Sequence, residues 1–356
     1  MKYLLLGLTG LYVSEIALGS MTFGGQGNWN VIGSLGVDHA VEQLRIFVDA
    51  GGNHLDTADM YSEGQTETIL GQAIRKLGLS PHDLVLATKV RHRVEAGVNA
   101  AGFSRDYILR AAEASLRRLG VDHLDLYYLH DIDKLTPLEE SLRAMEDLQR
   151  SGKVRHFGVS NFPAYKIAQT LGIADRRDWD RPVAAQMYYS AVGRDIEHEV
   201  IPVLQEEQVA LVAWSPLAGG FLTGKYARDA RATDGRRRDF SFPPVPDLAQ
   251  GHDTVDVLRA IAAERGLAVS QIALAWTLAR PVCASVIVGA SNPAQLRENL
   301  GAAGVALTSA EVDRIEAAYP RSDQYPRWQV EFQNRDRLAD AKQMLRLVAD
   351  DRVAAG

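Results

Sequence analysis

The stretch LDLYYLHDIDKLTPLEESLRAMEDLQRSGKVRHFGVS, residues 124–160, contains the unit from which the fold is predicted. Its two ends, 124–130 and 154–160, are short apolar runs typical of buried strands. Between them, residues 136–152 have the apolar spacing of an amphipathic helix, with Pro137 in its first turn. A strand, a helix and a strand in this order predict two parallel strands joined by a helical crossover.

The same alternation continues through almost the whole chain. The candidate strands are residues 15–19, 53–56, 84–89, 124–130, 154–160, 183–188, 209–214 and 283–289. Helical patterns lie between them, such as 104–120, which begins with Ser104 as its N-cap and ends at Gly120. Eight such strands in 356 residues predict a (β/α)8 TIM barrel, an α/β fold, as a single domain spanning 1–356. A doubly wound parallel sheet is the rival architecture.

Three segments lie outside the repeat. Residues 1–15 predict an N-terminal β-hairpin and not a signal peptide, because Gly7 and Gly10 interrupt a short apolar run and no small-residue cleavage site follows. Residues 226–251, after the seventh strand, are rich in Arg, Asp and Pro and predict a long functional loop. Beyond residue 320 we expect a C-terminal tail that begins irregular and then turns helical; its aromatic residues are Tyr325, Trp328 and Phe332.

Composition narrows the classes of partner. Lys plus Arg number 39 and Asp plus Glu 45, a net charge of −6, which argues against the broad basic surface that nucleic acids or anionic membranes require. No apolar stretch approaches the roughly 20 residues of a membrane span. The one cysteine, Cys283, lies in an apolar run typical of a buried, inert thiol and suits a reducing cytoplasm. We therefore expect a small-molecule partner, no nucleic acid and no membrane, and leave the oligomeric state open.

Four side chains with acid–base chemistry come from three successive strand ends. In a barrel, active sites lie at the C-terminal ends of the strands. Asp56 ends the second strand, Tyr61 follows in its loop, Lys89 ends the third strand and His130 ends the fourth. An ammonium beside a phenol favours the phenolate, a carboxylate supplies the counter-charge that a buried ammonium needs, and an imidazole offers a donor to a substrate oxygen. Each residue alone also fits an ordinary structural role. The segment HDID at 130–133 has no second histidine at ligand spacing, so no metal site is expected.

At these residues the chain resembles the aldo-keto reductase superfamily. The motifs that carry the resemblance are LDTADMY (55–61), ATK (87–89), LDLYYLH (124–130) and GVSNF (158–162). The resemblance implies an NAD(P)H-dependent oxidoreductase that interconverts an aldehyde or ketone and its alcohol by hydride transfer. It makes Tyr61 the general acid/base, Asp56 and Lys89 the groups that tune it, and His130 the group that orients the carbonyl.

The resemblance also implies a binding site for the nucleotide. Ser160, Asn161 and Gln186 would hydrogen-bond the nicotinamide amide, and Trp214 would stack on its ring. The segment 214–220 would wrap the pyrophosphate with backbone N–H groups, with Lys225 adding a cation. The other cofactor-binding residues implied in this way are Ser20, Met21, Gln26, Asp56, Ser215, Pro216, Leu217, Gly219, Gly289, Ser291, Gln295, Glu298 and Asn299.

NADP(H) is the predicted cofactor, with NAD(H) as the alternative. Many relatives grip the 2′-phosphate with a lysine and an arginine, but Gly289 and Gln295 stand at those places here. We expect the charge to come from the long loop, through Arg236 and its neighbours Arg231, Arg237 and Arg238. A run of arginines is equally typical of a solvated loop.

Three other functional classes deserve comparison. Several motifs, including TFGGQ (22–26), resemble the branch of the superfamily that contains bacterial reductases and the β subunits of voltage-gated potassium channels. The alternative function is therefore a nucleotide-binding regulatory subunit of a channel-like partner with little turnover. His130 argues against it, because we associate a different residue with that position in the channel subunits.

GGFLTGK (219–225) resembles a P-loop, but Tyr226 stands where Ser or Thr should bind magnesium. No Gly-x-Gly-x-x-Gly motif supports a Rossmann dehydrogenase.

The expected substrate pocket is aromatic. It is predicted to contain Trp29, Tyr61, His130 and Trp328, with Tyr128 or Tyr188 at a strand end. Such a wall suits hydrophobic or sugar-like carbonyl compounds, because rings pack on flat apolar faces. Ordinary packing is the competing explanation for the two tryptophans.

Overall fold

A computed structural model describes residues 1–228 and 242–333 of the chain. By its internal contacts the chain divides into two units, Met1–Tyr319 and Pro320–Gly356. The first unit is a barrel. Of the second, the described part contains the short helix α12 (Arg327–Gln333), in keeping with a tail that begins irregular and turns helical. The assignment of residues 1–356 to one domain stays a prediction.

Eight parallel strands close into a barrel in the order β10-β3-β4-β5-β6-β7-β8-β9. Their bounds are β3 (Ile16–Gly19), β4 (His54–Asp56), β5 (Val85–Val90), β6 (Leu124–Leu129), β7 (Val154–Ser160), β8 (Ala184–Tyr188), β9 (Ala210–Trp214) and β10 (Cys283–Val288). All eight predicted strands are confirmed, with ends that agree to within one residue. The (β/α)8 barrel is confirmed and the doubly wound sheet is excluded, because the sheet closes on itself.

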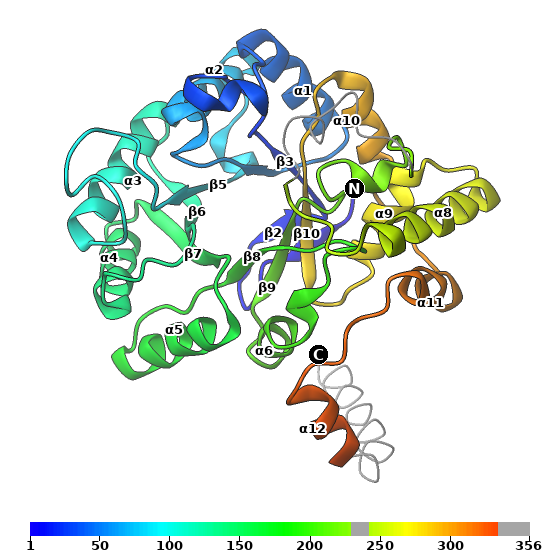
Figure 1. The fold of residues 1–356 in the computed structure, drawn as a ribbon. Helices are drawn as coiled ribbons and strands as arrows, with labels where there is room; N and C mark the ends of the chain where they lie inside the picture. Colours follow the sequence, from blue (N-terminus) through cyan, green and yellow to red (C-terminus); the bar gives the residue numbers. More distant parts are fainter. Residues whose placement is uncertain (229–241, 334–356) are drawn as a thin grey trace. The chain divides into compact units, whose positions relative to one another are not determined.

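Helices form a ring around the strands (Figure 1). They are α1 (Val37–Asp49), α2 (Gln65–Leu77), α3 (Arg105–Leu119), α4 (Leu138–Arg150), α5 (Ala164–Arg177), α6 (Val200–Glu206), α8 (Leu248–Arg265), α9 (Val269–Leu278), α10 (Pro293–Leu300) and α11 (Ser309–Ala318). Short 3-10 turns are η1 (Gly27–Val31), η2 (Tyr61–Gly64), η3 (Pro81–Asp83), η4 (Asp195–Glu197) and η5 (Phe221–Thr223). Helix α3 begins and ends as predicted: the Ser104 side chain accepts from the Tyr107 N–H, and Gly120 has the left-handed φ of 73° that ends many helices. Pro137 is the N-cap of α4, one place before its first turn.

The predicted N-terminal hairpin is present and closes one end of the barrel. Strands β1 (Tyr3–Leu5) and β2 (Tyr12–Ser14) pair antiparallel. Two hairpin side chains, Leu6 and Val13, are fully buried and belong to the apolar cluster inside the barrel. At Gly7 a Cβ would lie 2.4 Å from the Val183 carbonyl oxygen, so the close approach of the hairpin requires glycine there.

Alternation along β5 explains how a lysine comes to lie inside the barrel. Val85 and Ala87 belong to the inner apolar cluster, whereas Leu86 and Val90 pack in the outer layer between strands and helices. Because side chains alternate along a strand, Lys89 shares the inward face with Val85 and Ala87. The strand therefore delivers an ammonium group to the interior near its C-terminal end.

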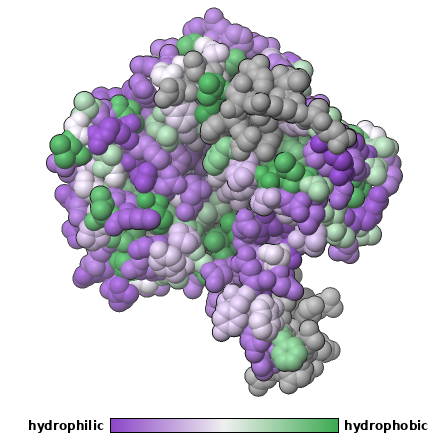
Figure 2. All heavy atoms as spheres, in the orientation of Figure 1, coloured by the Kyte–Doolittle hydropathy of each residue, from purple (hydrophilic) through white to green (hydrophobic). Residues whose placement is uncertain are grey.

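The outside of the barrel is polar. Figure 2 shows mostly hydrophilic side chains over the surrounding helices. Among residues 1–228 and 242–333, no helix has the length and apolar character needed to cross a membrane. Cys283 is buried, and burial raises the pKa of its thiol to about 12, as expected for an inert thiol.

Candidate active site

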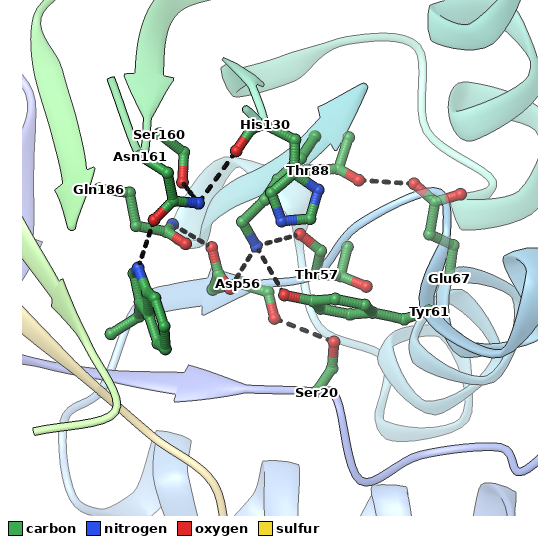
Figure 3. Close-up of polar contacts among 12 residues, drawn as sticks. Ser20, Asp56, Thr57, Tyr61, Glu67, Thr88, His130, Ser160, Asn161 and Gln186 are labelled. Atoms are coloured by element: carbon green, nitrogen blue, oxygen red, sulfur yellow. Dashed lines mark hydrogen bonds and ion pairs between the residues drawn. The ribbon is translucent and has the colours of Figure 1, made fainter. Parts of the chain in front are cut away.

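The four predicted catalytic side chains meet at the C-terminal end of the barrel. The Lys89 Nζ donates to Asp56 Oδ2 at 2.7 Å, to the Thr57 carbonyl oxygen at 2.7 Å and to Tyr61 Oη at 3.3 Å. Figure 3 shows Asp56, Tyr61 and His130 pointing toward one another. The rings of Tyr61 and His130 lie 6.1 Å apart, edge to face. The convergence expected from successive strand ends is thus observed.

Lys89 and Asp56 form a buried ion pair. Their side chains are 0% and 4% exposed. Burial acts to lower the pKa of Lys89, but Asp56 and Tyr61 outweigh it and raise that pKa above its ordinary value. Lys89 is therefore an ammonium at neutral pH, and it donates to the Tyr61 oxygen, which would become negative if Tyr61 gave up its proton.

The loop that carries Tyr61 is strained and firmly held. Ser62, Glu63 and Gly64 have successive φ values of 48°, 55° and 88°, a left-handed run that side chains other than glycine rarely adopt. The Ser62 hydroxyl donates to the Phe23 carbonyl at 3.3 Å and accepts from the Gly25 N–H at 2.9 Å. The TFGGQ segment therefore braces the turn that positions the Tyr61 phenol.

His130 is held as a neutral imidazole. It follows β6, and its backbone N–H donates to the Val90 carbonyl at 3.0 Å. Burial, reinforced by the nearby charge of Lys89, lowers the pKa of His130 well below its ordinary value. The ring is therefore uncharged at neutral pH and offers a neutral N–H to a carbonyl oxygen, which fits an orienting donor better than an acid.

The residues expected to hold a carboxamide are joined to the catalytic four. The Gln186 Nε2 donates to Asp56 Oδ1 at 2.7 Å, and the Asn161 Nδ2 donates to the His130 carbonyl at 3.1 Å and to Ser160 Oγ at 3.2 Å. Asn161 itself has a left-handed φ of 57°. The amide groups and the hydroxyl at this edge are the donors and acceptors that a carboxamide requires, so these residues fit the amide of a nicotinamide.

Trp214, at the end of β9, completes this side of the site. Its Nε1 donates to Asn161 Oδ1 at 2.9 Å. The Tyr188 ring lies 5.1 Å from the Trp214 ring, and the Phe242 ring stacks on it at 5.7 Å with an interplanar angle of 19°. The indole thus already accepts a flat ring in parallel stacking, which is the contact that a nicotinamide would need.

Comparison with known proteins identifies the family. The model of the aldo/keto reductase family matches residues 15–320. The chain belongs to this family. It is 38% identical, over 89% of its length and 96% of the relative, to a probable voltage-gated potassium channel subunit beta of Arabidopsis thaliana. It is 33% identical to the uncharacterized oxidoreductase YrpG of Bacillus subtilis (strain 168), with 90% and 96% of the two chains covered, and 31% identical to versiconal hemiacetal acetate reductase of Aspergillus parasiticus, with 90% and 97% covered.

In this aldo/keto reductase, the turn expected to wrap a pyrophosphate bonds to itself. The Ala218 N–H donates to the Ser215 carbonyl at 2.8 Å, the Gly219 N–H to Ser215 Oγ at 3.1 Å and the Gly220 N–H to the Leu217 carbonyl at 2.9 Å. These N–H groups are used within the turn, so the expected backbone contacts to a pyrophosphate require the bonds to be exchanged. Pro216 lies in the same turn, and the Lys225 Nζ lies 5.1 Å from the Tyr226 ring centroid.

The predicted adenosine segment is partly engaged elsewhere. The Ser291 N–H donates to Gln295 Oε1 at 3.0 Å, and Glu298 accepts from the Ser270 hydroxyl on α9. Asn299 is buried. At Gly289 a Cβ would find no atom nearer than 3.8 Å, so the missing lysine of the phosphate clamp is not excluded by space. Arg236 and the other loop arginines, Arg231, Arg237 and Arg238, lie outside the described residues.

Other predicted residues have varied positions. Ser20 is buried, and its hydroxyl donates to the Asp56 carbonyl at 2.9 Å, so it braces β4; Met21 is half-buried and Gln26 is exposed. The ring of Trp29 lies 5.4 Å from that of Tyr61; its role as a pocket residue stays a prediction. Trp328 belongs to the second unit, and its part in the pocket stays a prediction.

Tyr128 is the wrong choice of pocket tyrosine. It is fully buried and belongs to the apolar cluster inside the barrel, so it cannot form a wall open to substrate. Tyr188 is half-buried and packs on Trp214, which makes it the better placed of the two candidates.

Sequence reasoning missed several supporting contacts. Behind the site, the Thr88 hydroxyl donates to Glu67 at 2.6 Å, and Glu67 pairs with Arg118 at 2.6 Å. Phe242 belongs to the segment 226–251, for which the sequence predicts a functional loop, but its contact with Trp214 is not foreseen from the sequence. Within residues 1–228 and 242–333, no group of three or more His, Cys, Asp or Glu side chains could hold a metal ion.

Proposed function

We propose that this aldo/keto reductase interconverts an aldehyde or ketone and its alcohol with a nicotinamide nucleotide, using Tyr61 as the general acid and base. The observation that carries the proposal is the buried Lys89 ammonium, which donates both to Asp56 and to the Tyr61 oxygen. The bound nucleotide supplies or accepts the hydride. The carbonyl oxygen would lie between Tyr61 and His130, where the neutral imidazole orients it and the phenol gives it a proton.

The charge left on Tyr61 after proton transfer explains why Lys89 is held so firmly. Phenolate oxygen and ammonium attract each other strongly in a buried site, because water does not screen them. The Asp56 carboxylate and the Thr57 carbonyl fix the position of the ammonium, so little reorganisation is needed when the charge forms. The same Asp56 accepts from Gln186, which ties the proton donor to the proposed amide-binding residues.

We propose NADP(H) as the cofactor, with NAD(H) as the alternative. Ser160, Asn161 and Gln186 would hold the nicotinamide amide, and Trp214 would stack on the ring. The positive charge for a 2′-phosphate would come from Arg236 and the neighbouring arginines of the long loop. The cytoplasm remains the expected location, because the one cysteine is a buried free thiol.

The test is Tyr61→Phe. Loss of the phenol should lower kcat by about 10²- to 10⁴-fold, the usual contribution of a general acid, and leave nucleotide binding nearly intact. Turnover would be measured with NADPH and with NADH on aldehydes, ketones and secondary alcohols. The matched control is Tyr165→Phe on the outer face of α5, where the side chain is 67% exposed, and kcat should not change. A Tyr61→Phe enzyme with the kcat of the parent would refute the assignment.

A regulatory subunit is the second candidate function. It is favoured by the 38% identity to a protein described as a probable voltage-gated potassium channel subunit beta. This candidate predicts that NADPH quenches tryptophan fluorescence on binding, while none of the carbonyl compounds is reduced. Turnover that depends on Tyr61 would exclude it as the main function.

A further inference from the structure

A row of three polar side chains lies beside His130 and has no part in the proton transfer described above. Arg91 and His92 follow the end of β5, and Asp131 follows His130 after β6. The Arg91 Nη1 lies 3.3 Å from His92 Nδ1, and the His92 Nε2 lies 3.0 Å from Asp131 Oδ2. The His92 and Asp131 side chains are 26% and 36% exposed, so the row reaches solvent.

The direction of the hydrogen bonds follows from the chemistry of arginine. A guanidinium has only donors, so the His92 Nδ1 must accept from Arg91. The His92 Nε2 therefore carries the hydrogen and donates to Asp131. The row runs from the Arg91 guanidinium through the His92 ring to the Asp131 carboxylate, and Asp131, whose side chain is more exposed than that of His92, is an acceptor.

The backbone and side-chain contacts around the row hold it in place. The Arg91 Nε donates to the Ile132 carbonyl at 3.2 Å, and the Tyr107 hydroxyl donates to the His92 carbonyl at 2.6 Å. Asp131 is thereby positioned by groups from the segments that follow β5 and β6 and from α3 before any substrate arrives. A preorganised acceptor discriminates better than a mobile one.

The row of Arg91, His92 and Asp131 adjoins the predicted catalytic residues through His130. The His92 ring lies 5.1 Å from the His130 ring at an interplanar angle of 87°. Four rings follow one another, Trp29, Tyr61, His130 and His92, with 5.4 Å, 6.1 Å and 5.1 Å between neighbouring centroids. Trp29 therefore lies beside Tyr61 at one end of these four rings, and His92, bonded to the Asp131 carboxylate, lies beside His130 at the other end.

We propose that Asp131, positioned by His92 and Arg91, is a specificity-determining residue that accepts a hydrogen bond from a hydroxyl group close to the substrate carbonyl. The preferred substrates are hydroxylated aldehydes or ketones, because a carboxylate gains from a hydroxyl donor, gains nothing from a methyl group and repels an anionic substituent. This inference rests on the proposed carbonyl-reducing function and names its substrate class.

The experiment compares glyceraldehyde with propanal, which have the same three-carbon skeleton and differ in their hydroxyl groups. The value of kcat/KM with NADPH would be measured for the parent and for Asp131→Asn. The parent should prefer glyceraldehyde, and Asp131→Asn should reduce that preference by about ten- to a hundredfold, mainly through KM, the usual effect of removing a charged hydrogen-bond partner. Hydration of each aldehyde is the same for both proteins and cancels in the comparison.

The matched control is Asp122→Asn. Asp122 also pairs with a histidine, His123, and it lies two residues before β6, at the opposite end of the strand from Asp131. This variant should leave the preference unchanged. A parent that reduces propanal without preferring glyceraldehyde, or an Asp131→Asn variant that keeps the parental preference, would overturn the inference while the proposed function stands.

A chain that turns over neither aldehyde would count against the proposed function, and binding then decides the inference separately. Glycerol and 1-propanol would be titrated into the parent and into Asp131→Asn in the presence of NADPH, with tryptophan fluorescence as the readout. Tighter binding of glycerol that is lost in Asp131→Asn supports the role of Asp131. Equal binding of the two alcohols to the parent overturns it.

Discussion

The two ends of the barrel differ in how much backbone strain they contain. Within the described ranges, the residues other than glycine with left-handed φ at the C-terminal strand ends are Ser62, Glu63, Asn161, Ser215 and Ala218. Two more, Asp178 and Gln208, lie where α5 and α6 lead back toward the N-terminal strand ends. A left-handed residue is an ordinary way to end a helix, whereas a run of them in a catalytic loop is not. Strain that serves no helix end is thus concentrated beside the chemistry.

Buried ionisable groups show the same difference. Near the C-terminal end the interior contains the Lys89–Asp56 ion pair. At the start of β4 it contains His54, which is fully buried, with Nδ1 3.3 Å from the Ser285 hydroxyl. Burial lowers the pKa of His54 to about 4, so it is neutral at physiological pH. Of these two buried sites, the charged one is an ion pair, whereas His54 has no ion-pair partner among the described residues and is neutral.

The largest expected effect comes from breaking the ion pair. Lys89→Met leaves the Asp56 carboxylate buried without its partner, and the free energy of unfolding should fall by roughly 3–5 kcal/mol. Lys89→Met combined with Asp56→Asn should recover most of that stability and none of the activity. Urea denaturation and kcat measured on both proteins would test this. If Lys89→Met unfolds at the same urea concentration as the parent, stability does not depend on the pair.

The next effect is a loss of stability in acid that depends on His54. Its pKa is depressed in the folded state, so the folded chain cannot take up the proton that the unfolded chain binds below about pH 6.5. The contribution of His54 to the free energy of unfolding is fully present above that pH. It is lost as the pH drops toward 4, which lowers the free energy of unfolding by roughly 3 kcal/mol.

His54→Gln removes the titration and should flatten this part of the profile of unfolding free energy against pH. The neutral His130 at the other end has a pKa shifted in the same direction and remains in the variant, so part of the acid sensitivity should persist. A variant with the parental profile would show that His54 does not contribute.

The smallest effect compares strain at the two ends directly. Glu63 and Asp178 are both exposed, with φ values of 55° and 53°. Replacing either by glycine relieves about 1–2 kcal/mol of left-handed strain and costs about 0.5–1 kcal/mol of chain entropy, so each variant should gain up to about 1 kcal/mol. Asp178→Gly should keep the parental kcat, whereas Glu63→Gly should lower it, because the loop of Tyr61 becomes freer. Equal kcat values in the two variants would show that backbone strain in the loop of Tyr61 does not contribute to turnover.

The sequence predicts the strands and the convergence of the four proposed catalytic residues for one physical reason. Inward-facing apolar residues recur with strand periodicity, and parallel strands bring their C-terminal ends together, so Asp56, Lys89 and His130 had to converge. Tyr128 shows the limit of that argument, because alternation places it on the inward face with His130 but does not indicate how deeply it is buried.

Contacts made by loops are harder to foresee. The turn at Ser215 forms internal hydrogen bonds because Ser215 and Ala218 have left-handed φ values, which no sequence motif predicts. The ring of Phe242 stacks on that of Trp214, although the two residues are 28 positions apart in the sequence. His92 and Asp131 could have been found by extending the strand-end argument, since each lies one to three residues beyond a catalytic residue.

The hairpin at the start of the chain has a consequence for the order in which ligands bind and leave. Leu6 and Val13 pack inside the ring of strands, so the hairpin closes one end of the barrel. If the proposed function is correct, the nucleotide and the carbonyl compound both enter through the opposite end of the barrel. Two ligands that enter through one opening must bind in order, so the ligand that lies deeper binds first and leaves last. Its release then sets an upper limit on the turnover rate.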